Sequence, residues 1–400
     1  MRLISFLGTG DKDGKYQPTT YVFGDDSVPS NYVAYALATV LKPQEIKLIA
    51  TDKAWALHGV ALSKLLTDAD HPKPERVSVP TGGESQQLWQ MFGAIVEVIR
   101  CSKHPVLLDI THGFRMQPFF AAACIQYVQS VFPSAPPIRV VYGEYRGPDR
   151  ESPIWELTPF LEVLEWSRNL MMFLRTGQAD DVVEPTEALG RELGRQWATT
   201  SRQGPQPQIR MLADALQAFS NDFTTIRTGS LLIGEHASAN RLLNAIDKTK
   251  EEVNHCLPAL ANILDQVREM VAPLRTHGAR LSSKAGQQAL IALARLYQKM
   301  GRYSEAISIL REGWITLGAP TNCDHPGTEE FRDDWRTRVQ ENIWSLQVKQ
   351  SRTVSEMRND IQHAGFKQQP HDRSWFEDQL TTLLGQWQEA VDTMDQSSQG

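Results

Sequence analysis

The sequence predicts a Rossmann-like α/β domain followed by an all-α domain. Over the first 155 residues, short apolar runs alternate with amphipathic stretches, which is the rhythm of strands and helices in an α/β domain. After Pro159, apolar residues recur at helical spacing. A chain of 400 residues also exceeds the size at which a single core stops growing. We therefore expect two domains, residues 1–155 and residues 156–400.

The predicted strands of the first domain are short runs with few polar residues inside them. They are LISFL (3–7), IKLIAT (46–51), RVSV (76–79), VLLDI (106–110) and IRVVYG (138–143). The amphipathic stretches between them predict helices at about 30–41, 54–67, 84–100 and 114–131. Nearly continuous apolar strands separated by helices indicate a parallel sheet that is covered on both faces.

The second domain shows helical periodicity in 160–174, 289–300 and 304–317, and no convincing strand. Segment 176–208 is rich in Gly, Pro, Asp and Gln and is predicted to include loops. The stretch GRYSEAISIL (301–310) echoes the second helix of a tetratricopeptide repeat. Because a solenoid needs at least three repeats and one copy is found, we interpret this stretch as ordinary helical packing. The last six residues, DQSSQG, are expected to fray.

Composition favours a cytoplasmic globular protein. The chain is 41% hydrophobic and 22% charged, and it contains no apolar run of membrane-spanning length. Its apolar N-terminal run is too short for a secretory signal. The four cysteines are far apart and form no CxxC pair, so a structural zinc site is not expected. A net charge of −6 argues against non-specific coating of nucleic acid and leaves room for a local basic groove.

Small and polar residues follow three of the predicted strands, at the sheet edge where α/β domains bind ligands. They are Gly8-Thr9-Gly10, then the turn PTGGES (80–85), and then DITHGFR (109–115), which precedes a helix. Small residues let backbone N–H groups approach a phosphate, and the start of a helix favours anions. The dinucleotide fingerprint GxGxxG and the Walker A lysine motif are both absent. The sequence therefore predicts phosphate or nucleotide binding at this edge, outside the NAD and P-loop classes.

Near the C-terminus, the stretch RNDIQHAG places Arg358 five residues before His363. On a regular helix two such residues point about 140° apart, so they cannot form a pair on one face as residues four apart can. Either the arrangement is accidental, or something outside that helix completes its chemistry.

Taken together, these motifs resemble the CRISPR-associated CARF–HEPN proteins of type III systems. The stretches SFLGTG and YQPTTY (16–21) look like the start of that family's sensor domain, and DITHGFRMQP (109–118) matches the signature of its DxTHG branch. LTPFLEVLEWS is similar to the family's linker into the helical half, and RNDIQHAG matches the HEPN ribonuclease motif. The resemblance covers nearly the whole chain and is weakest over 176–280.

By this resemblance, the first domain is a CARF sensor that binds a cyclic oligoadenylate across a homodimer. Cyclic tetra-adenylate is the commonest activator in this branch, although nothing in the sequence fixes the ring size. The ligand-binding positions that carry over are Gly8, Thr9, Gly10, Thr111, His112, Gly113 and Arg115.

The same resemblance implies that the second domain is a HEPN endoribonuclease that cleaves single-stranded RNA without a metal or other cofactor. Two copies facing across a two-fold axis would bring Arg358 and His363 of both chains into one cleft. Arg358 would hold the scissile phosphate, and His363 would act as general base or acid. Asn359 would position the phosphate or cap the helix, while Asp360 would orient an arginine or histidine or simply be solvated.

Two other functions remain open at this stage. The protein could be a non-enzymatic, ligand-responsive regulator, or a ring nuclease whose sensor cuts its own cyclic ligand with help from His112 or Thr111. Six Lys or Arg and no acidic residue lie between Arg275 and Arg302. This basic stretch either guides an RNA backbone or forms a solvated helix face.

Overall fold

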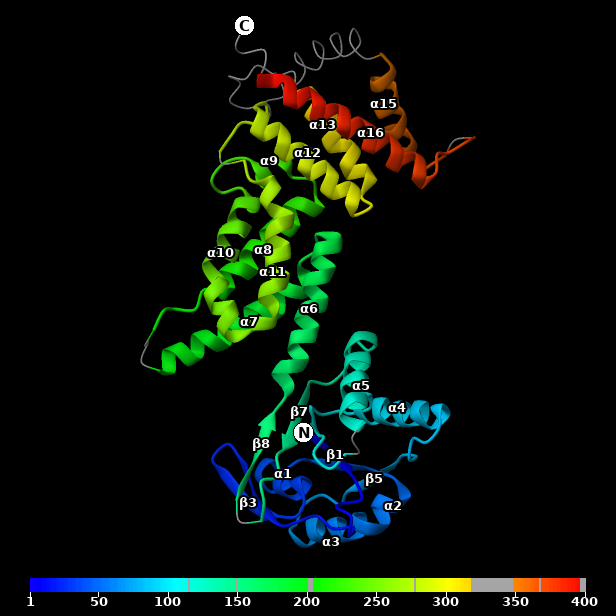
Figure 1. Ribbon diagram of the computed structural model, residues 1–400, viewed down its shortest axis with the longest axis vertical. Helices are drawn as coiled ribbons and strands as arrows, with labels where there is room; N and C mark the ends of the chain where they lie inside the picture. Colours follow the sequence, from blue (N-terminus) through cyan, green and yellow to red (C-terminus); the bar gives the residue numbers. More distant parts are fainter. Residues whose placement is uncertain are drawn as a thin grey trace. The chain divides into compact units, whose positions relative to one another are not determined.

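The computed structural model describes residues 1–113, 116–148, 150–200, 204–276, 278–317, 348–366 and 368–395 (Figure 1). The chain divides into two compact units, Met1–Leu164 and Glu165–Gly400. This division falls inside helix α6 (Thr158–Thr176), whereas the sequence pattern places the boundary just before that helix. The N-terminal unit is α/β, and the described part of the C-terminal unit is helical.

An eight-stranded sheet forms the centre of the N-terminal unit, in the order β3-β2-β8-β7-β6-β1-β4-β5. The five strands predicted from the sequence are all present, and each runs parallel to its neighbour in the set. They are β1 (Arg2–Leu7), β4 (Glu45–Ala50), β5 (Glu75–Ser78), β6 (Val106–Asp109) and β7 (Ile138–Gly143). The carboxyl ends of these strands therefore meet at one edge of the sheet.

The prediction of a wholly parallel sheet is wrong, because three further strands extend it beyond β7. They are β2 (Thr19–Phe23), β3 (Asp26–Ser30) and β8 (Glu151–Glu156). β8 runs antiparallel to β7, β2 pairs in parallel with β8, and β3 closes a hairpin with β2. Pro29 lies in β3 and Pro153 in β8, and a proline inside a short polar run argues against a strand unless it lies near a sheet edge.

Helices cover both faces of the sheet, as the apolar strands predict. On one face, α1 (Val33–Leu41) and α3 (Val60–Asp68) pack on Leu3 and Leu7 of β1. On the other face, α4 (Ser85–Arg100) and α5 (Gln117–Val131) pack on Ile4 and Phe6 of the same strand. β1 is therefore buried along its whole length, which explains why most of its residues are apolar.

The described part of the C-terminal unit is built from helices around one apolar core. After α6 these are α7 (Asp180–Thr199), α8 (Ile209–Thr224), α9 (Thr228–Leu232), α10 (Ser238–Cys256), α11 (Ala261–Val271), α12 (Lys284–Lys299), α13 (Tyr303–Leu317), α15 (Val348–Gln362) and α16 (Arg373–Asp392). Aromatic side chains fill the core: Phe173, Phe219, Phe223, Tyr297 and Trp387 are fully buried.

Segment 176–208 includes loops at 177–179 and 204–208, as predicted, but the sequence did not predict α7, which occupies its centre. Val182, Thr186 and Gly190 of this helix are buried at a spacing of four residues, so its apolar face is narrow and partly made of small residues. A Cβ at Gly190 would lie 2.3 Å from the Arg210 side chain. The glycine therefore serves close packing against α8 rather than a turn.

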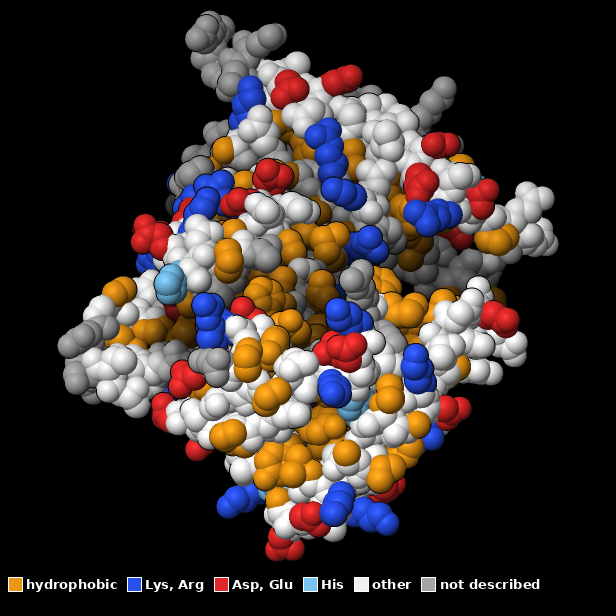
Figure 2. Space-filling view, turned by 60° about the horizontal axis from the view of Figure 1, so that its bottom comes forward, with side chains coloured by type: hydrophobic (Ala, Val, Ile, Leu, Met, Phe, Trp, Pro, Cys, Tyr) orange, Lys and Arg blue, Asp and Glu red, His pale blue; other side chains and the backbone are white. Residues whose placement is uncertain are grey.

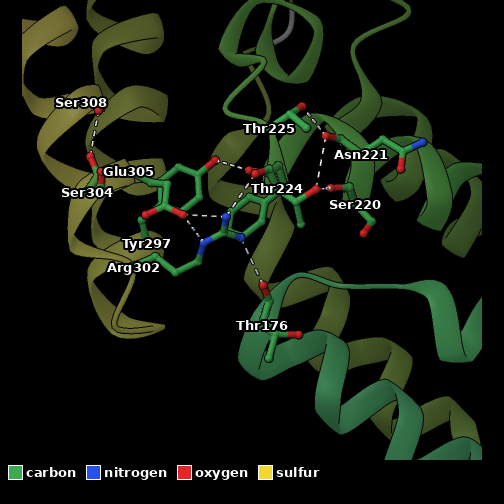
Figure 3. A network of polar contacts seen from close by, with 11 residues as sticks. Thr176, Ser220, Asn221, Thr224, Thr225, Tyr297, Arg302, Ser304, Glu305 and Ser308 are labelled. Atoms are coloured by element: carbon green, nitrogen blue, oxygen red, sulfur yellow. Dashed lines mark hydrogen bonds and ion pairs between the residues drawn. The ribbon is translucent and has the colours of Figure 1, made fainter. Parts of the chain in front are cut away.

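Arg302, between α12 and α13, joins several helices of the C-terminal unit (Figure 3). Its guanidinium pairs with Glu305 at 2.6 Å and donates to the carbonyl oxygens of Thr176 and Thr224 at 3.4 and 3.2 Å. Those two residues end α6 and α8, where a cation stabilises the unpaired carbonyls and the helix dipole. The guanidinium also lies 5.3 and 5.4 Å from the ring centroids of Phe223 and Tyr297.

The basic stretch 275–302 is thus not a uniform cationic face. Arg302 is used inside the unit, and Arg275 donates to Asn244 at 2.9 Å, whereas Arg295 and Lys299 are exposed. On the face of the described residues that Figure 2 shows, Lys and Arg side chains are scattered among acidic ones. The contacts of Arg275 and Arg302 within the unit weaken the interpretation of the stretch as an RNA-guiding groove.

Replacing Arg302 with methionine is expected to lower the free energy of unfolding by about 2–3 kcal/mol, because Glu305 and two helix-terminal carbonyls lose a charged donor. The methionine keeps the apolar stem over the aromatic rings, so the loss reports the polar contacts. Arg295→Met, at an exposed position of α12, is the control and should change stability by less than about 0.5 kcal/mol. Urea unfolding followed by circular dichroism measures both, and equal midpoints would contradict the role given to Arg302.

Candidate functional site

The ends of three neighbouring strands are tied together by the buried carboxylate of Asp109, the last residue of β6. It accepts hydrogen bonds from the Ser5 hydroxyl of β1 at 2.6 Å and from the Thr111 backbone N–H and hydroxyl at 2.9 and 2.5 Å. The Thr111 hydroxyl in turn accepts from the backbone N–H of Gly143, at the end of β7, at 2.7 Å. Asp109 is fully buried, and burial raises its pKa, opposed by these hydrogen bonds.

Thr111, a predicted ligand-binding residue, therefore also has a structural role at this edge. Its hydroxyl proton is directed at Asp109, and its oxygen receives the Gly143 N–H. The Asp-x-Thr spacing fits this geometry, because a carboxylate can accept from the N–H two residues ahead. The threonine fixes the position of the turn that follows, Thr111–Gly113.

The turns after β1 and β6 are brought into contact, as the sequence predicts. A Cβ at Gly8 would lie 2.5 Å from the backbone oxygen of His112, so a larger residue cannot fit without moving backbone. Gly10 has a φ of +78°, and a Cβ there would lie 2.7 Å from the Lys15 carbonyl oxygen. Thr9 lies between them. Two of the three predicted ligand-binding turns thus form one continuous surface at the edge of the sheet.

A stack of three rings lies against these turns. The ring of Tyr16 stacks on the imidazoles of His58 and His112, with centroid separations of 4.2 and 4.0 Å and interplanar angles of 23° and 27°. Two imidazoles cannot both stack on one face of a phenol ring at these distances without colliding, so they lie on opposite faces. The Tyr16 hydroxyl oxygen accepts the backbone N–H of Gly8 at 2.8 Å.

His112 is a neutral member of this stack rather than the anion-favouring group that the sequence suggests. Burial, and then the nearby His58, lower the pKa of His112 from 6.5 to about 3. Its Nε2 lies 3.5 Å from the backbone N–H of Val33, the first residue of α1. At neutral pH the ring therefore offers a stacking face and an acceptor, not a positive charge.

His112 is expected to make the folded protein sensitive to acid. The unfolded chain takes up a proton at this residue near pH 6.5 and the folded chain near pH 3, so between these values the unfolded state binds more protons and stability falls as pH is lowered. His112→Phe keeps a stacking ring that does not titrate. Its free energy of unfolding should fall less steeply over this window, by up to about 1.4 kcal/mol per pH unit. Parallel slopes in urea titrations at several pH values would contradict this expectation.

His58 is a member of the site that sequence reasoning missed. It lies on η1 (Trp55–Gly59), one turn of π-helix between α2 (Asp52–Ala54) and α3, and such turns change the direction of a side chain relative to a regular helix. Its Nδ1 shares a hydrogen bond of 3.2 Å with the Tyr32 hydroxyl. A Cβ at Gly59 would lie 2.4 Å from the Trp55 ring, so a glycine inside an apolar helix is the one signal that the sequence offers.

The structure gives different results for the other residues that the sequence places at this edge. In the turn before α4, the N–H groups of Gly82 and Gly83 both donate to the Gln87 side-chain oxygen at 3.1 Å, so they are used within the turn. Gly113 packs against Gln117, whose side-chain oxygen would lie 2.9 Å from a Cβ. Arg115 lies outside the described residues.

The second candidate site is the C-terminal end of α15, where the helix stops at the predicted motif. Ala364 and Gly365 have φ values of +51° and +67°, and the Gly365 N–H donates to the Asp360 carbonyl at 2.9 Å, closing the helix with a left-handed turn. The Ala-Gly pair after His363 thus marks a helix end. Arg358, Asn359 and His363 are all exposed.

Asp360 is buried, with 5% of its surface exposed, which rules out the alternative that it is simply solvated. One of its carboxylate oxygens accepts the backbone N–H of His371 at 3.0 Å. His371 also contacts Glu356 of α15 at 3.0 Å and stacks on Trp375 of α16, with 3.6 Å between ring centroids. Asp360 therefore helps to fix the segment that returns from His363 to α16.

A single chain places Arg358 and His363 near one end of α15 without joining them. Among the described residues, no hydrogen bond or ion pair is recorded between the two side chains. Phe366, three residues after His363, is 92% exposed, and its N–H donates to the His363 carbonyl at 2.9 Å. The described residues contain no group of three or more His, Cys, Asp or Glu able to hold a metal ion.

Comparison with known proteins gives two similarities. Residues 289–313 match the tetratricopeptide repeat family, and they lie within α12 and α13, the helices whose sequence echoes that repeat. The chain is also 23% identical over 256 residues to CRISPR-associated protein MJ1674 of Methanocaldococcus jannaschii. The aligned region covers 50% of this chain and 40% of that protein. The chain thus spans well under half the length of this relative. In the part of the chain that the structure describes, no helix is long and apolar enough to cross a membrane.

Proposed function

We propose that this protein is a CRISPR-associated endoribonuclease, activated by a cyclic oligoadenylate and independent of metal. The observation that carries the proposal is the end of α15, where Arg358 and His363 are exposed on a turn fixed by Asp360 and Gly365. Similarity to a CRISPR-associated protein and the resemblance of both halves to the CARF–HEPN family support it.

The chemistry follows from the two side chains and the substrate. RNA carries its own nucleophile, the 2′-hydroxyl, so cleavage needs a proton acceptor, a proton donor and a group that stabilises the charged phosphate. An imidazole can transfer the protons near neutral pH, and a guanidinium can bind the phosphate through two parallel hydrogen bonds. His363 and Arg358 supply these groups, with Asn359 beside the arginine as a further phosphate donor.

A homodimer would complete this site. Arg358 and His363 lie five residues apart around the end of one helix, so one chain presents them in different directions. Two copies of the α15 end meeting across a two-fold axis place the arginine of one chain near the histidine of its partner. In one chain the Arg358 and His363 side chains are both exposed and are not hydrogen-bonded to each other, so both are available to a cleft shared with a second chain.

The activator site lies at the carboxyl edge of the sheet in the N-terminal unit. The Gly8–Gly10 and Thr111–Gly113 turns present backbone donors beside a stack of aromatic rings, a combination suited to phosphates and bases. Because a cyclic oligoadenylate with an even number of adenylates has a two-fold axis, two such edges related by the same axis can bind one ring.

The test is incubation of the purified protein with labelled single-stranded RNA, with and without cyclic oligoadenylates of three ring sizes. Cleavage that requires one of the rings and persists in EDTA is the expected result. Loss of cleavage in EDTA with recovery on adding a divalent ion would contradict the metal-independent mechanism. Consumption of the cyclic ligand with no RNA cleavage would identify a ring nuclease instead, and binding with neither reaction would identify a regulator.

A further inference from the structure

The Tyr16 side chain makes both of the contacts that a nucleotide would make at this edge. Its ring is stacked between two imidazoles, as a base is stacked between aromatic side chains. Its hydroxyl oxygen accepts the Gly8 N–H at 2.8 Å, a backbone donor of the kind that binds phosphate oxygens. The residue therefore fills a position that is shaped and polarised for a ligand.

Tyr16 lies in a loop whose hydrogen bonds centre on Asp11, and its own carbonyl oxygen accepts from the Asn31 side chain at 3.2 Å. The Asp11 carboxylate accepts hydrogen bonds from the N–H groups of Asp13 and Lys15 and from the Gln17 side chain, at 2.8 to 3.0 Å. These three partners and Asp11 are exposed. Moving Tyr16 out of the stack would leave the hydrogen bonds around Asp11 intact.

His58 supplies a second, independent observation that points to a ligand. The residue is 4% exposed, and its Nε2 is buried without a hydrogen-bond partner in the part of the chain that the structure describes. A buried nitrogen without a partner destabilises the free protein, and a ligand atom in the plane of the imidazole would supply that partner. A base that replaced Tyr16 would stack on the face of the His58 ring, so the in-plane Nε2 would take its partner from the ribose or phosphate of the same nucleotide rather than from the base.

We propose that the slot between His58 and His112 binds an adenine base of the activator, and that Tyr16 occupies this slot in the free protein until the ligand displaces it. The inference rests on the proposed function, of which it names the base-binding residues. It also gives a role to Gly10, whose positive φ and close approach to Lys15 let the loop fold back so that the phenol hydroxyl reaches the Gly8 N–H.

The proposal is tested by whether substitution of Tyr16 raises or lowers the affinity for the ligand. Calorimetric titration with cyclic tetra-adenylate and with adenosine monophosphate is carried out on the full chain, on Tyr16→Ala and on Tyr16→Phe. Removing an internal competitor should tighten binding by about tenfold, because apparent affinity falls with the fraction of protein whose site is occupied. Tyr16→Phe, which keeps the ring and frees the Gly8 N–H, should lie between the two. Tyr127→Ala, a half-exposed position on α5, is the control and should bind as the wild type does.

A second readout uses the unaltered protein, in case Tyr16→Ala does not fold. Nitration of tyrosines by tetranitromethane, followed by peptide mass spectrometry, should modify Tyr16 faster in the presence of cyclic tetra-adenylate than in its absence. Slower nitration would mean that Tyr16 clamps the ligand, and it would overturn the proposal, as would weaker or unchanged binding by Tyr16→Ala. His58→Ala should weaken binding of both probes, and unchanged affinity would likewise exclude the slot.

The outcomes also separate this inference from the proposed function. Wild-type binding that the Tyr16 variants do not tighten overturns the slot and leaves the sensor function standing. Binding of adenosine monophosphate by Tyr16→Ala, with no response of the wild type to any cyclic ring, assigns the slot and overturns the proposed activator. Absence of binding in all chains overturns both.

Discussion

His363→Ala is expected to abolish RNA cleavage while leaving the affinity for the cyclic activator nearly unchanged. General acid–base groups contribute about 100- to 10,000-fold to rate, and the exposed imidazole at the end of α15 is the group assigned to proton transfer. Because the residue lies in the C-terminal unit, the ligand edge should not sense its loss. Cleavage assays at saturating activator and calorimetric titration measure the two effects, and substantial activity in this variant would refute the catalytic assignment.

Arg358→Ala should give the same loss, since the phosphate loses its charged partner. Arg358→Lys is the matched control: it keeps the charge but not the planar pair of donors, so it should recover part of the activity. Full activity in the lysine variant would show that charge alone suffices at this position.

Mixing the two inactive chains tests whether the cleft is shared. A dimer of one His363→Ala chain with one Arg358→Ala chain retains one arginine and one histidine, and it should show activity that neither homodimer has. If arginine and histidine instead act within one chain, the mixed dimer will be as inactive as its parents.

The second large effect is expected at Asp109, whose carboxylate accepts three donors at the ends of β1 and β6. Asp109→Leu leaves those donors buried without an acceptor, and we expect a loss of about 3–5 kcal/mol in the free energy of unfolding. Binding of the activator should be lost as well, because the Thr111–Gly113 turn is no longer fixed. Asp109→Asn, of the same shape and able to accept from Thr111, is the control and should retain most of both properties.

The buried Asp109 carboxyl also makes the stability of the folded protein depend on pH in a definite direction. Burial raises the pKa of Asp109, so the unfolded chain gives up this proton at a lower pH than the folded one. Between the two values the folded state binds more protons, and its stability falls as pH rises. Asp109→Asn cannot ionise and should lack this component. Urea titrations across the acidic range would reveal an identical pH profile if the carboxylate were not involved.

The parallel core of the sheet could be predicted because most of its strands are largely buried and rich in apolar residues. β2, β3 and β8 could not. β3 is an edge strand that contains Pro29, and Pro153 argues against a strand although β8 is paired with both β7 and β2. The sequence pattern did not predict α7 for a related reason. The buried face of this helix uses Thr186 and Gly190 in place of large apolar side chains. Pattern reasoning detects burial, and it fails where burial is achieved with small or polar residues.

The candidate sites divide in a similar way. Gly8, Gly10 and the Thr111–Gly113 turn could be placed at one edge because parallel strands end together. His58 could not, because its orientation depends on a π-turn that no periodicity reveals. Nor does spacing show that Asp360 is buried beneath the turn while Arg358 and His363 remain exposed, since burial depends on α16 packing nearby.

The Arg302 contacts bear on how far this protein is modular. In a solenoid, each repeat touches its neighbours alone and can be added or deleted as a unit. The hairpin of α12 and α13, which resembles a repeat, instead contacts helices that are not its neighbours in the sequence. Arg302 binds the ends of α6 and α8, and a Cβ at Gly313 would lie 1.9 Å from the Trp387 ring of α16. Removing or exchanging this hairpin would break contacts with α6, α8 and α16, so it is an integral part of its unit rather than a separable repeat.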